Sequence, residues 1–134
     1  RELARYPMCI AVAPKHPLAK LKTITFAQVA DEPLIAYSRK DYPEYHAMLA
    51  KLFAPTGRKP RVVEEHDGVT SIVAAVESGN GFALVPGCVA CMVGPRLKLI
   101  PLASAPEISV IAAWKKKSET EWVKSFVAAT SAGK

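Results

Sequence analysis

The side chains that could carry out chemistry are few in this sequence, and they do not form a catalytic pattern. His46, His66 and Asp67 are the candidates for acid–base catalysis. Adjacency does not make His66 and Asp67 a dyad, and His46 falls off the main apolar stripe of its predicted helix. The sequence contains neither a nucleophile elbow nor a glycine-rich phosphate loop. We therefore do not predict an enzyme and keep a small α/β enzyme only as an alternative.

The cysteines do not predict a metal or redox centre either. Cys88 and Cys91 form a single C-x-x-C, without the second ligand pair of a zinc site and without the flanking tryptophan of thioredoxin-like motifs. Cys9 lies in an apolar strand pattern and is predicted to be core. An odd number of cysteines in a chain unlike a small secreted scaffold indicates a reducing compartment. We expect no metal and no cofactor.

The stretch from Asp67 to Pro86 is the clearest candidate for a ligand site. Helical apolar spacing is present at Val69, Ile72, Val73 and Val76. Asp67 is the predicted N-cap of this helix, and the free N–H groups of a helix start attract anions. Gly79 and Gly81 are predicted to end it with positive φ angles. The following run, Phe82–Val85, is apolar at every position, which is typical of a strand buried on both faces.

Strands and helices alternate along the chain, which is the pattern of the α/β class. Apolar runs predict further strands at Met8–Ala13, Leu34–Tyr37, Val62–Glu65, Leu97–Leu102 and Ile108–Trp114. Capping boxes at Thr25–Gln28 and Ser118–Glu121 and a first-turn proline, Pro43, predict helix starts. We therefore predict a three-layer structure with an open, mainly parallel sheet. Its ligand crevice is expected outside the carboxyl strand ends, at Ser38–Arg39, Glu65–Val69 and Val85–Gly87.

Composition adds few constraints. The chain has 134 residues, of which 50% are hydrophobic and 22% charged, as expected for one globular domain. The formal net charge of +6 permits anion or nucleic-acid binding, but no predicted helix has the basic face that direct DNA recognition requires. No apolar run is long enough for a membrane helix, and no signal peptide opens the chain. Because the chain starts at Arg1, we expect a fragment or a processed product.

Four segments resemble the effector-binding domain of LysR-type transcriptional regulators in their order and spacing. They are KHPLA (15–19), TITFAQVADEPLI (23–35), SRKDYPEY (38–45) and DGVTSIVAAVESGNGFALVP (67–86). The resemblance implies a type II periplasmic-binding-protein fold, with two subdomains and a small-molecule inducer between them. It also implies a cytoplasmic bacterial regulator that is a homo-oligomer, a dimer of dimers. A solute-binding protein of a transporter shares this fold and is the main alternative.

The resemblance also implies which part of such a regulator is present. Residues 7–104 correspond approximately to the second subdomain, and 105–134 to the return strand and final helix. The winged helix-turn-helix, through which DNA is bound, and most of the first subdomain are not in this sequence. Cys88 and Cys91 stand where the family usually has a polar residue, so they are not expected to be part of its machinery.

By position, the resemblance places the inducer between the loop after the second strand and the helix that follows Asp67. The implied contacts are Ser38, Arg39, Tyr42, Gly68, Val69 and Thr70, together with the region of Phe82. A guanidinium can bind a carboxylate with two hydrogen bonds, and a tyrosine ring can stack on a ligand ring. We therefore expect a small organic carboxylate, including aromatic acids. The alternatives are that Arg39 pairs with Asp41 and that Tyr45 is core.

The last helix carries an apolar face that is expected to be an interface. Its residues are Trp122, Val123, Phe126 and Val127. In the family this face packs on the first subdomain, most of which this chain lacks. Since the preceding strand should carry the helix away from the body, we expect the face to be buried in a second copy of the chain.

Overall fold

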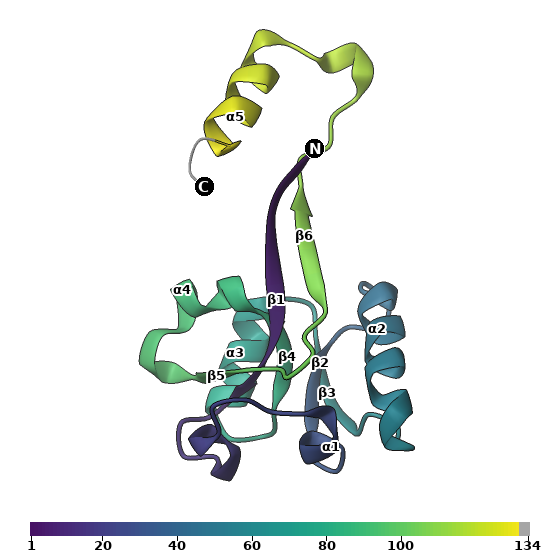
Figure 1. Cartoon of the computed structure of the whole chain (residues 1–134), viewed down its shortest axis with the longest axis vertical. Helices are drawn as coiled ribbons and strands as arrows, with labels where there is room; N and C mark the ends of the chain where they lie inside the picture. Colours follow the sequence, from purple (N-terminus) through teal and green to yellow (C-terminus); the bar gives the residue numbers. More distant parts are fainter. Residues whose placement is uncertain (132–134) are drawn as a thin grey trace.

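The computed structural model describes residues 1–131, which form a layered body and an arm that projects from it (Figure 1). The strands are β1 (Glu2–Val12), β2 (Leu34–Tyr37), β3 (Val62–His66), β4 (Ala83–Pro86), β5 (Lys98–Pro101) and β6 (Glu107–Ile111). Strand pairing and a bridge between Leu34 and Phe82 order the strands of the body as β3-β2-β4-β1-β5. Strands β2 to β5 run in the same direction and β1 runs against them. The predicted α/β fold with a mainly parallel sheet is confirmed.

Strand β1 belongs to both the body and the arm. Its first half pairs antiparallel with β6, from Glu2 opposite Ile111 to Pro7 opposite Glu107. From Met8 onward it lies between β4 and β5, where every residue to Val12 is buried. The sequence predicted only this buried half, because the half in the arm lacks a continuous apolar run.

Helices cover both faces of the sheet. Helices α1 (Phe26–Val29) and α2 (Pro43–Phe53) lie on one face, and α3 (Val69–Glu77) and α4 (Ala90–Val93) on the other. Leu84 of β4 enters the core under α1 and α2, whereas its neighbours Ala83 and Val85 enter the core under α3 and α4. This alternation explains why the strand is apolar at every position.

Short 3₁₀ helices occupy several of the connections. They are η1 (Pro17–Lys20), η2 (Ala54–Thr56), η3 (Gly87–Val89), η4 (Gly94–Arg96) and η5 (Lys116–Ser118). The capping box before α1 is confirmed, since the Thr25 amide donates to Gln28 Oε1 at 2.9 Å. The second predicted box is wrong, because Ser118 ends η5 and the Thr120 hydroxyl instead accepts from the amide of Val123. None of the helices in residues 1–131 is long and apolar enough to cross a membrane.

Two predictions at the ends of α3 are wrong. The N-cap is Gly68 rather than Asp67, and its backbone is extended. Gly79 has the predicted positive φ, of 83°, but Gly81 does not. A Cβ on Gly81 would collide with the carbonyl oxygen of Pro33, so glycine is required there because β2 and the start of β4 approach closely.

The arm consists of the first half of β1, β6 and α5 (Glu121–Ser131). The amino group of Arg1 donates to the Ala112 carbonyl at 2.8 Å, which joins the chain start to the end of β6. Figure 1 shows this pair of strands rising from the body, with α5 at the far end. Strand β6 ends at Ile111, earlier than predicted, and the chain then turns through η5 into α5.

Candidate functional site

The loops that follow β2 and β3 are joined where the two strands end. The Ser38 amide donates to the His66 carbonyl at 2.8 Å, and the Tyr42 hydroxyl donates to the Asp67 carbonyl at 3.1 Å. These two bonds hold the loop before α2 against the segment that leads into α3. The sequence therefore placed Ser38, Tyr42 and the start of α3 together correctly at the carboxyl edge of the sheet.

The start of α3 offers uncapped backbone donors. No side chain in the described part of the chain caps this helix, and the first intrahelical bond runs from the Ile72 amide to the Gly68 carbonyl. The amides of Val69 and Thr70 precede that bond, so they are among the donors that a helix leaves without an internal acceptor. A carboxylate placed there would accept hydrogen bonds and interact favourably with the helix dipole.

A cavity of about 330 Å³ opens beside this loop, and we call it the tyrosine cavity. Its lining residues are Met8, Tyr37, Tyr42, Glu44, Tyr45, Met48, Pro86 and Ile108. The Tyr37 ring lies 4.8 Å from that of Tyr42 and 5.1 Å from that of Tyr45, measured between centroids. Apart from the carboxylate of Glu44, rings, methionines and aliphatic groups form this lining, a surface suited to a flat apolar ligand group.

Burial raises the pKa of two phenols that line this cavity. Burial raises the pKa of Tyr45, whose hydroxyl donates to the Leu84 carbonyl at 3.2 Å. The pKa of Tyr37 is also raised, mainly by burial and further by the neighbouring Tyr42. Within residues 1–131 the Tyr37 hydroxyl forms no hydrogen bond. It can therefore donate to a ligand in the cavity.

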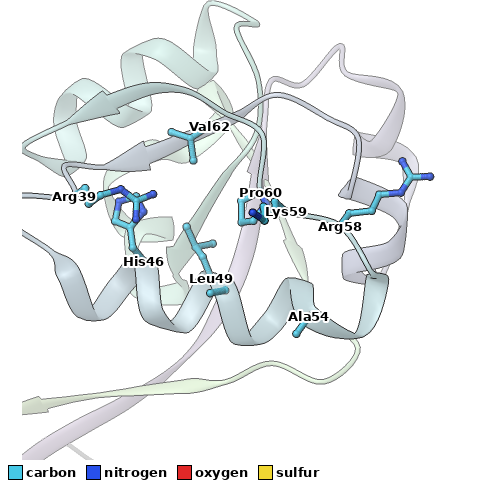
Figure 2. A pocket seen from close by; sticks show the side chains of 9 residues that line it. Arg39, His46, Leu49, Ala54, Arg58, Lys59, Pro60 and Val62 are labelled. Atoms are coloured by element: carbon cyan, nitrogen blue, oxygen red, sulfur yellow. The ribbon is translucent and has the colours of Figure 1, made fainter.

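Arg39 and Phe82 do not line the tyrosine cavity, so their predicted inducer contacts gain no support from its geometry. The Arg39 amide donates to Glu65 Oε2 at 2.9 Å, and its side chain lines a second cavity, on another side of α2 (Figure 2). Its nearest acidic partner is Glu65, with Nε 4.0 Å from Oε1, rather than the Asp41 considered as an alternative. Phe82 has no exposed surface and belongs to the core, as predicted for the run Phe82–Val85, and its side chain lines neither cavity. The alternative that Tyr45 is core is supported by its hydrogen bond to Leu84 and its packing beside that core.

Pro86 lies in the predicted crevice segment Val85–Gly87, but other lining residues of the tyrosine cavity were missed by sequence reasoning. Tyr37 ends β2, next to the predicted Ser38, so the rule of strand ends could have found it. Met8 and Ile108 had no such signal. They reach the cavity only because the first half of β1 pairs with β6, two strands that lie near opposite ends of the sequence.

The histidines do not form a catalytic arrangement in the described residues. His46 is buried, and its Nε2 lies 2.6 Å from the Tyr37 carbonyl, a bond that joins α2 to β2. His66 Nε2 lies 3.0 Å from Glu64 Oε2 of the same strand, β3. The His46 contact therefore joins two elements that border the crevice, whereas the His66 contact is local.

The cysteines are free thiols. Cys9 is buried, which raises its pKa, and Cys91 Sγ donates to the carbonyl of Cys88 at 3.0 Å. Among residues 1–131 there is no group of three or more potential ligands that could hold a metal ion.

The fold and the crevice together define an α/β ligand-binding domain of the periplasmic-binding-protein type. Residues 1–132 match the family model described as the LysR substrate binding domain. The chain therefore belongs to this family, and the resemblance seen in the sequence is confirmed.

Relatives and solved structures agree with this assignment. The HTH-type transcriptional regulator TtuA of Agrobacterium vitis is 31% identical over 121 residues, which cover 87% of this chain and 40% of that protein. The effector-binding domain of QuiR in complex with shikimate matches with a TM-score of 0.75 at 20% identity, over 97% of this chain and 61% of that chain. The BenM effector-binding domain with benzoate matches with a TM-score of 0.70 at 22% identity, over 98% of this chain and 60% of that chain. The chain thus spans less than half of the curated relative and about three fifths of the solved domains.

The named relatives are regulators rather than enzymes. TtuA is named as a transcriptional regulator, and so is the Hca operon activator HcaR of Escherichia coli, of which this chain spans 43%. What the family model shows of this chain is a substrate-binding domain.

Proposed function

We propose that this chain is the inducer-binding part of a cytoplasmic bacterial regulator, and that it senses a small organic carboxylate to control transcription. The observation that carries the proposal is the tyrosine cavity beside the uncapped start of α3. Membership of the LysR family favours this role over that of a transporter's solute-binding protein. DNA would be bound only by a winged helix-turn-helix outside this chain, and residues 7–104 would be the second subdomain.

The site has a polar side and an apolar side that suit a ring bearing a carboxylate. The carboxylate would accept hydrogen bonds from the amides of Val69 and Thr70, at the start of α3 beside Gly68. The ring would lie against Tyr37 and Tyr42. Ser38 borders the same edge through its bond to the end of β3. Shikimate and benzoate, the ligands named for two related solved domains, both combine a ring with a carboxylate.

The affinity for benzoate tests this site. We expect Tyr42→Ala to weaken binding about tenfold, because it removes an aromatic contact and the hydroxyl that holds the Asp67 carbonyl. Phe126→Ala is the control, since it removes an exposed aromatic side chain of α5 that does not line the cavity. Calorimetric titration of the two variants and the wild type gives the comparison. Equal losses for both variants, or none for Tyr42→Ala, would exclude the site.

We further propose that the apolar face of α5 forms an interface between two copies of the chain. Trp122 is 86% exposed and Phe126 59%, and beside them lies Ile111, the exposed end of β6. Val123 and Val127 border a hollow of about 530 Å³ between α5 and residues 111–114. Val127 is only 6% exposed, so it packs within the chain, and Trp122, Phe126 and Ile111 are the side chains left for a partner. Burying each large apolar side chain contributes roughly 1.5–3 kcal/mol, so this surface favours association.

Sedimentation tests the interface directly. We expect the wild type to be a dimer at micromolar concentration and Trp122→Glu with Phe126→Glu to be a folded monomer, because two buried carboxylates would oppose association. Ser125→Glu, which adds a charge at an exposed polar position of the same helix, should leave the dimer intact. A monomeric wild type and an unfolded double variant would show instead that the face packs within one chain.

A further inference from the structure

A second cavity, of about 430 Å³, lies between α2, η2 and the start of β3, and we call it the basic groove. Its lining residues are Arg39, His46, Leu49, Ala50, Ala54, Arg58, Lys59, Pro60 and Val62. No carboxylate is among them, although the chain as a whole contains 12 acidic residues. None of these lining residues borders the tyrosine cavity. The basic groove is therefore a separate site with a different chemical character.

Two of the cations of the groove are separated by apolar side chains. Figure 2 shows Arg39 and His46 together on one side, Lys59 overlapping Pro60 further along, and Leu49 and Val62 between Arg39 and Lys59. The stretch from Arg39 to Lys59 is thus aliphatic in its middle. A ligand that fills it would need an anionic group at each of the two ends of this stretch and a short apolar chain between them.

The cations at the two ends are available to a ligand. The Arg39 side chain is 66% exposed, and its only ion pair in residues 1–131 is the long contact with Glu65. Lys59 has no ion pair in the described part of the chain. Arg58, in contrast, pairs with Asp31 and points away from the groove in Figure 2. Arg39 and Lys59 are therefore the groups that would bind the anions, Arg39 with the geometry to bind a carboxylate through two hydrogen bonds.

His46, which lies beside Arg39, fixes the wall of the groove that α2 forms. Its ring lines the groove while Nε2 is held by the Tyr37 carbonyl, and the side chain is only 7% exposed. The α2 wall is thus tied to β2 and does not need to be ordered by the ligand. A preformed wall lowers the entropic cost of binding.

We propose that the basic groove binds a linear organic dianion, with one anionic group at Arg39 and the other at Lys59. This site is additional to the inducer site and does not depend on it. Because both cations are exposed to solvent, the affinity is modest and falls as salt is added.

A series of unbranched dicarboxylates, from malonate through succinate and glutarate to adipate, tests the proposal. Amide shifts of the folded chain are followed by NMR during each titration. We expect the shifts to map to 39, 46–54 and 58–62, and the affinity to pass through a maximum at one chain length. Pentanoate, which replaces one carboxylate of glutarate by a methyl group, should bind about tenfold more weakly than the best dicarboxylate.

Charge variants supply the second half of the test. Arg39→Gln and Lys59→Gln should each weaken the best dicarboxylate about five- to tenfold. Arg61→Gln removes the same charge from a neighbouring residue that does not line the groove, so it should have no such effect. The spectra also report whether each variant is folded. Tyr42→Ala should leave the dicarboxylate affinity unchanged, because Tyr42 does not line the basic groove.

Three results would overturn the proposal. The first is an absence of shifts in the groove at ligand concentrations up to about 10 mM. The second is equal binding of glutarate and pentanoate, which would mean that only one anionic group is recognised. The third is an equal loss in Arg61→Gln, which would assign the effect to the net charge of the surface.

Discussion

Phe82→Ala is expected to lower the free energy of unfolding by about 3–5 kcal/mol, the usual cost of removing a fully buried aromatic side chain. Phe82 has no exposed surface and packs in the core beneath α1 and α2. It also joins the two parts of the sheet, because its amide donates to the Pro33 carbonyl at 2.9 Å and its carbonyl accepts from the Ile35 amide at 2.8 Å. Urea denaturation measured by circular dichroism gives the change.

Two comparisons separate this core role from a role in ligand contact. Phe126→Ala removes the same side chain where it is 59% exposed, and it should change the stability of the monomer by no more than about 0.5 kcal/mol. Phe82→Leu keeps most of the core filled and should retain the benzoate affinity of the wild type. A folded Phe82→Leu variant that loses this affinity would show that Phe82 contacts the ligand after all.

Gly81→Ala is expected to destabilise the chain by about 1–3 kcal/mol, the range typical of overpacking. The added methyl group would collide with the backbone oxygen of Pro33, which cannot rotate away as a flexible side chain does. Relief requires β4 to separate from β2, and this movement would weaken the bonds around Phe82. Thermal unfolding of the variant measures the effect.

Gly68→Ala is the matched control for this substitution. Gly68 has an extended backbone, with φ of −153°, and no atom lies within 4 Å of the position of an added Cβ. The free energy of unfolding of Gly68→Ala should therefore stay within about 0.5 kcal/mol of that of the wild type. If Gly81→Ala were as stable as Gly68→Ala, the close approach of the two strands would not be a constraint on the sequence.

Local signals predicted most of the body of this protein. Helix α2 begins at Pro43 as predicted, because a proline in the first turn has no amide that the helix needs. Strand β2 spans the predicted residues, since Pro33 and the polar segment after Tyr37 bound a fully apolar run. Strand β4 follows α3, and its continuous apolar composition correctly predicted that both of its faces are buried. In each case the signal lies within a few residues of the feature.

Features that depend on distant contacts were not predictable in this way. Nothing near Gly81 indicates that Pro33 approaches it, so a glycine needed for space was interpreted as a glycine needed for its φ angle. Arg39 and Tyr42 are close in sequence, yet their side chains line two different cavities, because the chain passes from the end of β2 into α2 between them. Met8 and Ile108 meet at the tyrosine cavity only through pairing across the arm.

The most direct test of the inducer site is to map benzoate on the chain by amide-shift NMR. The proposed function predicts shifts at Ser38, Tyr42, Gly68, Val69 and Thr70, together with the residues that line the tyrosine cavity. Residues of the basic groove beyond Arg39 and the outer arm should not shift, and Tyr42→Ala should reduce the shifts at the start of α3. Shifts confined to other surfaces, with none at residues 68–70, would contradict the account of how this domain binds its ligand.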